Sequence, residues 1–155
     1  DYASIVTDRH FDRLQAIVAD ARDKGAEVIE VNPANEDFSN TNARKMPLTI
    51  LKNVSEDMKA MQEEIFGPVL SVMTFRTPQE AVTKANNTEF GLSAGIWSEK
   101  GSRILKLADQ LNAGVVWANT FNQFDPTSPF GGFKESGYGR EGGKQGLAAY
   151  LKGGY

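Results

Sequence analysis

The sequence predicts an α/β protein in which an open, largely parallel sheet is flanked by helices. Short apolar runs that suit strands alternate along the chain with stretches that carry apolar residues at helical spacing. Such alternation is typical of an open sheet whose strands run mainly parallel. The 155 residues, 40% of them hydrophobic and 24% charged, are enough for one domain with a modest core.

The first half of the chain predicts three strands and two helices. Runs rich in apolar and β-branched residues predict strands at 26–31, 48–54 and 69–75. Helical spacing of apolar residues behind cap residues predicts helices at 7–24 and 58–62. The polar residues 32–45 predict a surface loop or a hairpin excursion. The last of the three strands is so apolar that we expect it to be buried.

The second half repeats the alternation. Thr77, Pro78 and Glu80 predict a helix start with a threonine cap, a proline in the first turn and a capping-box glutamate. Short apolar runs predict strands at 93–97 and 115–118. A cap at Ser98 and apolar residues at helical spacing predict a helix at 98–113, and a final helix is expected at 142–151. Residues 119–140 between them are expected to form a long loop.

The composition excludes several classes of function. The chain has no cysteine, and hence no disulfide, thiolate metal site or cysteine nucleophile of its own. Its single histidine, His10, lies between Asp8 and Asp12, and we expect it on the surface rather than in a catalytic or metal site. The net charge of −3 and the absence of a Lys/Arg run argue against nucleic acid as a partner. No apolar run is long enough to cross a bilayer, so no membrane partner is expected.

Residues 128–143 lack helix or strand periodicity and hold six of the 15 glycines. Glycine permits a positive φ and a close approach of main chains, which ordered functional loops use. Residues 137–142 match the dinucleotide-binding pattern G-x-G-x-x-G, but no apolar strand precedes them and the chain ends before the acidic residue expected about 20 positions later. A glycine-rich turn packed against aromatic residues is the favoured interpretation, and a phosphate site is the alternative.

A pair of adjacent carboxylates, Glu63 and Glu64, precedes the sequence Phe66-Gly67-Pro68. Adjacent residues at a helix end do not share a face, so a paired acid/base dyad is not expected. Two interpretations remain from the residues alone. Either both carboxylates are solvated, or one accepts hydrogen bonds from the hydroxyls of a ligand while the other faces water.

Six aromatic residues gather in and just before the glycine-rich loop: Trp117, Phe121, Phe124, Phe130, Phe133 and Tyr138. This number exceeds what turn formation needs. The group predicts either a lid on the core or an apolar pocket for a ligand.

Four segments resemble the aldehyde dehydrogenase superfamily: 63–69 (EEIFGPV), 86–94 (NNTEFGLSA), 114–120 (GVVWANT) and 128–143. They follow the family's order and spacing, and the likeness covers essentially all of the chain. The resemblance implies oxidation of an aldehyde to a carboxylic acid with NAD or NADP. In the family a cysteine thiolate attacks the aldehyde carbon, hydride passes to the nicotinamide, and water hydrolyses the thioester.

The resemblance also implies roles for three residues close to the cofactor. Glu64 is expected to hydrogen-bond the hydroxyls of the nicotinamide ribose. Phe66 is expected to pack near the nicotinamide and to help hold its ring. Leu92 matches an apolar position close to the same ring.

Four further positions match residues on the substrate side of the family's site. Phe124 and Phe130 match aromatic residues that flank the aldehyde tunnel. Glu141 matches a buried carboxylate in a proton relay with the catalytic base. The neighbouring Arg140 is expected to brace the structure and a subunit contact.

The resemblance is incomplete in one respect. The family's nucleophilic cysteine, general-base glutamate, oxyanion-hole asparagine and glycine-rich cofactor domain all belong upstream of the matched region. Residues 1–155 are therefore expected to be the C-terminal part of an aldehyde dehydrogenase catalytic domain, lacking the cofactor domain and the nucleophile-bearing segment, and to be inactive alone. The alternative is a free-standing noncatalytic module of this fold that serves association or ligand binding.

The expected partners follow from the same resemblance. They are a small-molecule aldehyde and, because an incomplete sheet exposes strand edges and apolar surface, further copies of the chain in a homo-oligomer. A cytoplasmic location is expected. The sequence gives conflicting indications of the substrate. Residues 44–47 and 61–64 resemble coniferyl-aldehyde enzymes, whereas residues 122–126 resemble broad-range or betaine-aldehyde enzymes.

Overall fold

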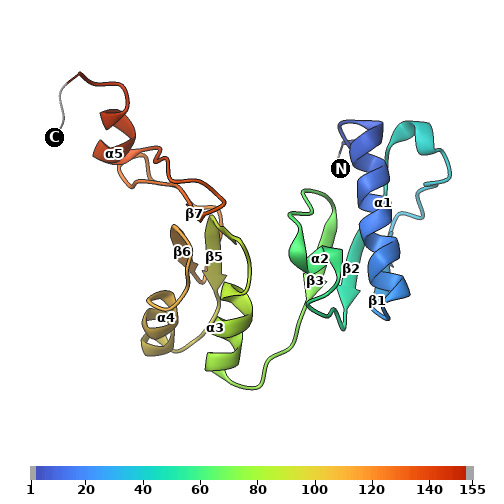
Figure 1. The fold of residues 1–155 in the computed structure, drawn as a ribbon, viewed down its shortest axis with the longest axis horizontal. Coiled ribbons are helices and arrows are strands. Elements are labelled where there is room, and N and C mark those ends of the chain that lie inside the picture. The colour runs from blue at the N-terminus through green and yellow to red at the C-terminus, as the bar shows by residue number, and fades with distance from the viewer. Residues whose placement is uncertain (1–2, 153–155) are drawn as a thin grey trace. The chain divides into compact units, whose positions relative to one another are not determined.

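The computed structural model describes residues 3–152, with the exception of the Thr41 side chain. The chain divides between Thr74 and Phe75 into two compact units (Figure 1). Each unit contains both helices and strands, which confirms the predicted α/β class. No helix within residues 3–152 is long and apolar enough to cross a membrane.

The first unit is a three-stranded sheet covered by a long helix. Its elements are α1 (Asp8–Asp23), β1 (Glu27–Val31), the 3₁₀ turn η1 (Thr41–Ala43), β2 (Leu48–Lys52), α2 (Lys59–Gln62) and β3 (Val69–Val72). The strand order is β1-β2-β3. β1 pairs antiparallel with β2, with Ile29 opposite Ile50, and β2 pairs parallel with β3.

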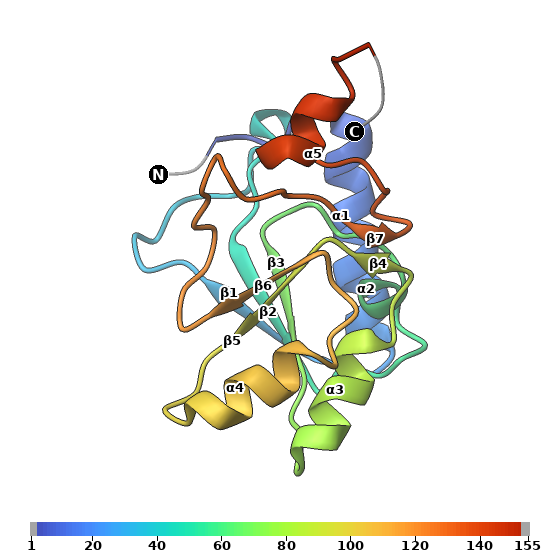
Figure 2. The same ribbon diagram turned by 90° about the vertical axis from the view of Figure 1, so that its left-hand side faces the viewer.

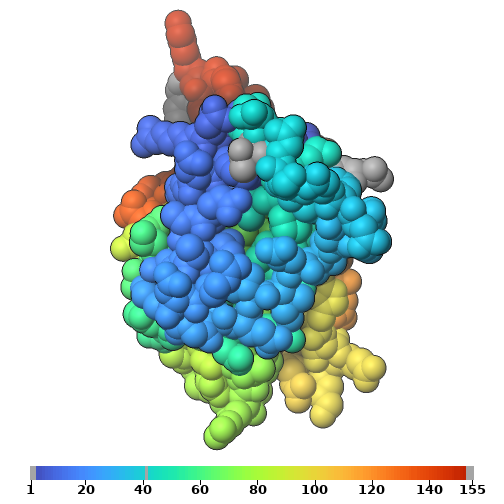
Figure 3. Space-filling view, turned by 90° about the vertical axis from the view of Figure 1, so that its right-hand side faces the viewer, coloured from blue at the N-terminus to red at the C-terminus, as the bar shows by residue number. Residues whose placement is uncertain are grey.

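Helix α1 forms because a threonine caps its N-terminus and its apolar residues fall on one face. The Thr7 hydroxyl accepts a hydrogen bond from the N–H of His10 at 3.2 Å, as an N-cap residue should. The apolar stripe buries Leu14 and Ile17 completely, and Ile17 packs with Leu51 of β2 and Met58. In Figure 3, α1 (blue) and the segment between β1 and β2 (cyan) form the face of this unit that is turned to the viewer.

The second unit contains two small sheets and three helices. Its elements are α3 (Pro78–Asn86), β4 (Phe90–Gly91), β5 (Ser93–Ile96), α4 (Gly101–Ala108), β6 (Val115–Ala118), β7 (Phe133–Lys134) and α5 (Gly143–Ala148). β5 and β6 pair parallel, while β4 and β7 pair antiparallel. Helices α3 and α4 lie side by side next to β5 (Figures 1 and 2).

Local hydrogen bonds fix the turns of this unit. The Thr77 hydroxyl accepts from the N–H of Glu80 at 3.1 Å, which confirms the predicted cap of α3. Two asparagine side chains pair with the main chain as a peptide group would. Asn86 accepts from the N–H of Asn112 and donates to the carbonyl of Gln110. The Asn119 side chain accepts from the N–H of Ser98 and donates to the carbonyl of the same residue. It thus extends the hydrogen bonding between β5 and β6 by one residue.

Strand direction is more mixed than the sequence predicts. The two parallel pairs, β2–β3 and β5–β6, are each joined through a helix, whereas β1 and β2 are joined by residues 32–47, which return the chain without an α-helical crossover. This segment is thus the predicted hairpin excursion. The predicted burial of the third strand is wrong, because Leu70 in β3 is 60% exposed. β3 is an edge strand in the described chain, with a neighbour on one side only.

Candidate functional site

The segment at residues 63–67 leaves the end of α2 and leads into β3. Glu63 has an extended main chain (φ −111°, ψ 150°), so α2 stops there. Phe66 then adopts a φ of +54°, in the left-handed region. This region is rare for a bulky residue with a β-carbon and marks a turn or a strained functional position. The segment is therefore held in a conformation that its own residues do not favour.

Two side chains of α1 hold this segment by its carbonyl groups. Nε2 of His10 lies 2.8 Å from the carbonyl oxygen of Phe66, and because a carbonyl can only accept, the imidazole donates. Arg13 donates from Nη1 to the carbonyl of Ile65 at 2.9 Å and from Nη2 to the carbonyl of Glu64. Three consecutive carbonyl groups are thus bound by one helix. The prediction of a surface histidine without a specific role misses this contact.

The side chains of the segment divide into a packed set and a presented set. Ile65 packs against the core of the unit, and Glu63 forms an ion pair with Arg13 at 3.6 Å. The Glu64 side chain is exposed, and its carboxylate forms no hydrogen bond or ion pair with any residue from 3 to 152. Phe66 is 81% exposed. Of the two adjacent carboxylates, Glu64 is therefore the one available to a ligand.

Leu92 lies in the second unit, between β4 and β5. Its carbonyl accepts from the N–H of Val115 at 3.2 Å, which ties the residue to the start of β6. Its side chain is 43% exposed. The structure thus presents Leu92 as an apolar surface residue on a main chain fixed by sheet hydrogen bonds.

Four of the six aromatic residues form a connected group that begins at β6. Trp117 is buried, and its ring meets those of Phe121 and Phe124 edge-on, with centroids 4.8 and 5.7 Å apart. Phe124 meets Phe130 in the same way at 4.9 Å. Since Phe124 is 57% exposed, this group is open to solvent on one side, which favours the ligand-binding interpretation over the core lid.

Glu141 lies next to this aromatic group. Its main chain forms an isolated antiparallel bridge with Phe130, with both N–H···O distances at 2.7 Å. Glu141 is exposed within residues 3–152, and the burial that the resemblance implies for its carboxylate stays a prediction. The structure therefore brings the rings of Phe124 and Phe130 together and joins Glu141 to Phe130 through the main chain.

The loop around these residues is fixed by unusually close main-chain packing. A β-carbon on Gly114 would lie 1.7 Å from the carbonyl oxygen of Gly131. Arg140 donates from Nη1 to the carbonyls of Gly132, Tyr138 and Gly139, which agrees with its predicted bracing role. Its guanidinium also lies over the ring of Phe133, 5.4 Å from the centroid.

The G-x-G-x-x-G stretch lies in this loop without the surroundings of a dinucleotide site. The strand before it, β7, has only two residues, and the helix after it, α5, has six. Two of its glycines, Gly137 and Gly142, have positive φ angles of 92° and 72°, as turns require. The geometry favours the predicted glycine-rich turn.

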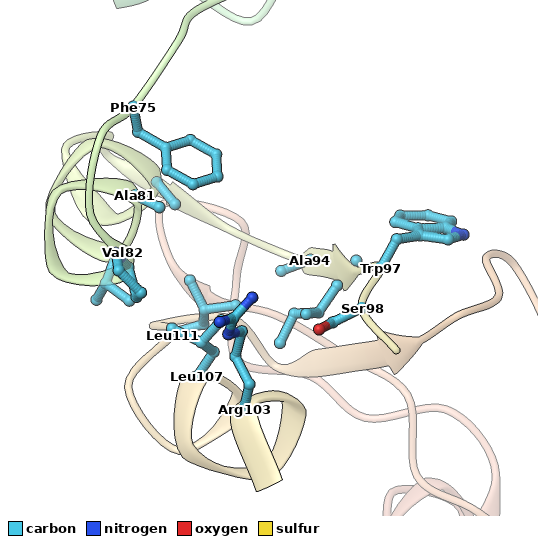
Figure 4. Close-up of a pocket in the computed structure, with 13 residues that line it drawn as sticks. Phe75, Ala81, Val82, Ala94, Trp97, Ser98, Arg103, Leu107 and Leu111 are labelled. Atoms are coloured by element: carbon cyan, nitrogen blue, oxygen red, sulfur yellow. The ribbon is translucent and has the colours of Figure 1, made fainter. Parts of the chain in front are cut away.

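A separate hollow of about 350 Å³ lies between α3, α4 and β5 (Figure 4). Its lining is mainly apolar, with Val82 and Leu107 from the two helices and Ala94 from β5. Arg103 supplies its only charged side chain. None of the six predicted site residues lines this hollow. No cluster of three or more metal-ligating side chains occurs within residues 3–152.

Comparison with known proteins identifies the family. A model of the aldehyde dehydrogenase family matches residues 1–153. The chain belongs to the aldehyde dehydrogenase family. This membership confirms the resemblance carried by the four sequence segments.

Individual relatives agree with the family model. A mitochondrial aldehyde dehydrogenase of Leishmania tarentolae is 48% identical over 104 residues, which is 67% of this chain and 21% of that protein. A protein of Caulobacter vibrioides named as a probable coniferyl aldehyde dehydrogenase is 39% identical over 152 residues, or 97% of this chain and 31% of that one. The chain thus spans about a fifth to a third of the length of these relatives.

A solved structure shows the same arrangement of elements. The betaine aldehyde dehydrogenase of Staphylococcus aureus in complex with NAD+ superposes with a TM-score of 0.86 and 33% identity, over 96% of this chain and 30% of that one. Coniferyl-aldehyde and betaine-aldehyde types both occur among the relatives, as the mixed likeness of the sequence predicts.

Proposed function

We propose that this chain is part of an NAD(P)-dependent aldehyde dehydrogenase that oxidises an aldehyde to a carboxylic acid. The family match supports the reaction class, and the NAD+ complex of the staphylococcal relative supports the cofactor. The observation that carries the proposal is the presentation of Glu64 and Phe66. A carboxylate without a partner and an exposed phenyl ring lie two residues apart on a segment that α1 holds by three carbonyls.

These two side chains fit the nicotinamide end of the cofactor. An ionised carboxylate only accepts hydrogen bonds, so Glu64 can bind the two neighbouring hydroxyls of a ribose. Phe66 offers an apolar ring that can pack beside the nicotinamide. For Leu92 the family's motif alone supports a role, and an apolar contact to the cofactor is proposed. When bound, the nicotinamide accepts the hydride that leaves the aldehyde carbon.

The aromatic group in the second unit is proposed to bind the aldehyde. Phe124 and Phe130 meet edge-on, and Phe124 is open to solvent, so together they offer an apolar wall. Glu141 is bridged to Phe130 through the main chain, and this link supports a role for Glu141 next to that wall. We assign to Glu141 the transfer of a proton between the site and its surroundings.

The remaining catalytic groups are proposed to come from polypeptide outside these residues. The sequence contains no cysteine, so it cannot supply the family's nucleophile. Residues 1–155 are accordingly assigned to part of the catalytic domain, and the chain alone is expected to be inactive. The exposed apolar residues of β3, Leu70 and Val72, support association, and a homo-oligomer is proposed.

The test uses the complete polypeptide that carries these residues and, in parallel, the 155-residue chain. The complete polypeptide is expected to reduce NAD or NADP when an aldehyde is added, and the 155-residue chain is expected not to do so. Glu64→Gln should raise the KM for the cofactor about tenfold, because it weakens charge-assisted hydrogen bonds. Glu56→Gln, another exposed carboxylate of the first unit, is the matched control and should change nothing.

Two results would contradict the proposal. One is aldehyde-dependent cofactor reduction by pure 155-residue chain. The other is an unchanged cofactor KM in Glu64→Gln, which would remove the assigned role of Glu64.

A further inference from the structure

We propose that His10 and Arg13 are positioning residues that set the conformation of residues 64–66 for cofactor binding. This inference rests on the proposed function, because it assumes that Glu64 and Phe66 bind the cofactor. Neither residue needs to touch the cofactor itself. They act through the main chain of the segment that does.

The main-chain conformation of residues 64–66 needs stabilisation by contacts from outside the segment. Phe66 has a positive φ of 54° and an 81% exposed side chain, so neither backbone preference nor burial of its ring favours the observed conformation. A residue in such a conformation persists when its surroundings over-determine it. The surroundings must therefore supply the constraint.

The hydrogen bonds from α1 supply that constraint. The carbonyls of Glu64 and Ile65 accept from the two terminal nitrogens of Arg13, and the carbonyl of Phe66 accepts from His10. His10 and Arg13 are three residues apart on a helix and hence on one face. A rigid helix face thus fixes the orientation of three successive peptide groups.

The close approach of the segment to α1 is a second, independent constraint. A β-carbon on Gly67 would lie 2.6 Å from both methyl carbons of Leu14, a fully buried residue of the same helix face. Only glycine lets the main chain come this near without displacing Leu14. His10, Arg13 and Leu14 together form the surface on which the segment is seated.

The arrangement leaves the two proposed binding side chains free while their main chain is fixed. Arg13 binds the Glu63 carboxylate and not that of Glu64, so the charge proposed to meet the ribose is not neutralised by an ion pair. Preorganisation of this kind strengthens binding because less freedom is lost when the ligand arrives. Loss of the hold should therefore weaken cofactor binding without changing any proposed cofactor contact.

The test compares variants of the complete polypeptide. Arg13→Met and His10→Leu remove the donors, whereas Arg13→Lys keeps the charge but cannot span two carbonyls, and His10→Gln keeps one donor. Arg9→Met is the matched control, because Arg9 is an exposed arginine of α1 whose side chain forms no hydrogen bond or ion pair within residues 3–152. The measurements are the Kd of NAD without aldehyde, the KM values for NAD and aldehyde, and amide hydrogen exchange of residues 63–69 without cofactor.

The removal variants should raise the Kd and KM for NAD about tenfold, leave the KM for aldehyde unchanged, and speed exchange in residues 63–69. His10→Gln should restore most of the affinity and Arg13→Lys only part of it. If a removal variant does not fold, its conservative partner decides through the same measurements. Faster exchange with unchanged NAD affinity overturns the inference and leaves a structural role alone.

The outcome for Glu64→Gln separates the two proposals. If Glu64→Gln weakens NAD binding but the His10 and Arg13 variants do not, the positioning role is wrong and the proposed function stands. If the unmodified polypeptide binds neither NAD nor NADP, the proposed function fails and the positioning role fails with it.

Discussion

Replacing Gly114 with alanine is expected to destabilise the second unit strongly. The added β-carbon would lie 1.7 Å from the carbonyl oxygen of Gly131 and 2.8 Å from its carbonyl carbon, whereas an ordinary contact begins near 3.4 Å. Main chain lies on both sides of the contact, so no side chain can rotate away. The strand β6 and the loop at Gly131 must separate by well over an ångström.

The expected size follows from this overpacking. Inserting a methyl group into a well-packed site usually costs about 1–3 kcal/mol, and a clash between two main chains belongs at the upper end, so we expect a loss of about 3 kcal/mol. For a protein of this size such a loss lowers the Tm by roughly 6–12 °C. Thermal unfolding followed by circular dichroism measures the change.

Gly101→Ala is the matched control for the same substitution. Gly101 begins α4 and has no atom within 4 Å of the position of an added β-carbon. Alanine favours a helix over glycine by up to about 1 kcal/mol, so this variant should keep or slightly raise the Tm. A Tm of Gly114→Ala equal to that of the unmodified protein would refute the close packing of Gly114 on Gly131.

Two further predictions concern single hydrogen bonds. Thr77→Ala should lower the free energy of unfolding by about 1 kcal/mol in a denaturant titration, because it removes the cap of α3. Thr77→Ser keeps the hydroxyl and should not lower it. Equal free energies of unfolding for the two variants would contradict the role of Thr77 as a cap. A hydrogen bond from the backbone N–H of Lys59 holds the pKa of Asp20 below its usual value. Ionised Asp20 therefore stabilises the fold at any pH above the usual pKa of an aspartate, and this contribution is lost as the pH falls through the lowered pKa. Asp20→Asn should therefore show a smaller loss of stability below about pH 4 in an acid titration, and an unchanged acid midpoint would count against it.

Local patterns account for the features that the sequence predicts well. Thr77 caps the helix that it was expected to cap, because capping depends on residues three positions apart. The parallel strand β6 has the predicted bounds, since its run of apolar residues ends at Gly114 on one side and at a polar loop on the other. The two-residue strands β4 and β7 were not predicted, because two residues carry no periodicity.

The candidate site is predicted only in part, for reasons of distance and surroundings. The roles of Glu64 and Phe66 follow from the family's motif and remain proposals, but the motif does not show what holds the segment. Arg13 lies 51 and 52 residues from the two carbonyls that it binds, and His10 lies 56 residues from its own. No local pattern reports such contacts. The spacing of His10, Arg13 and Leu14 on one helix face is the only signal that could have indicated them.

The asparagines that stand in for peptide groups make this fold sensitive to a slow chemical change. Asn86 and Asn119 each use a side-chain N–H to bind a main-chain carbonyl, at 2.8 and 3.0 Å. Hydrolysis of either amide would leave a carboxylate, which has no donor and would face that carbonyl with like charge density. The end of α3 and the last rung of the β5–β6 ladder would then lose a hydrogen bond without any mutation in the gene. The age of a protein molecule, as well as its sequence, thus bears on the order of this unit.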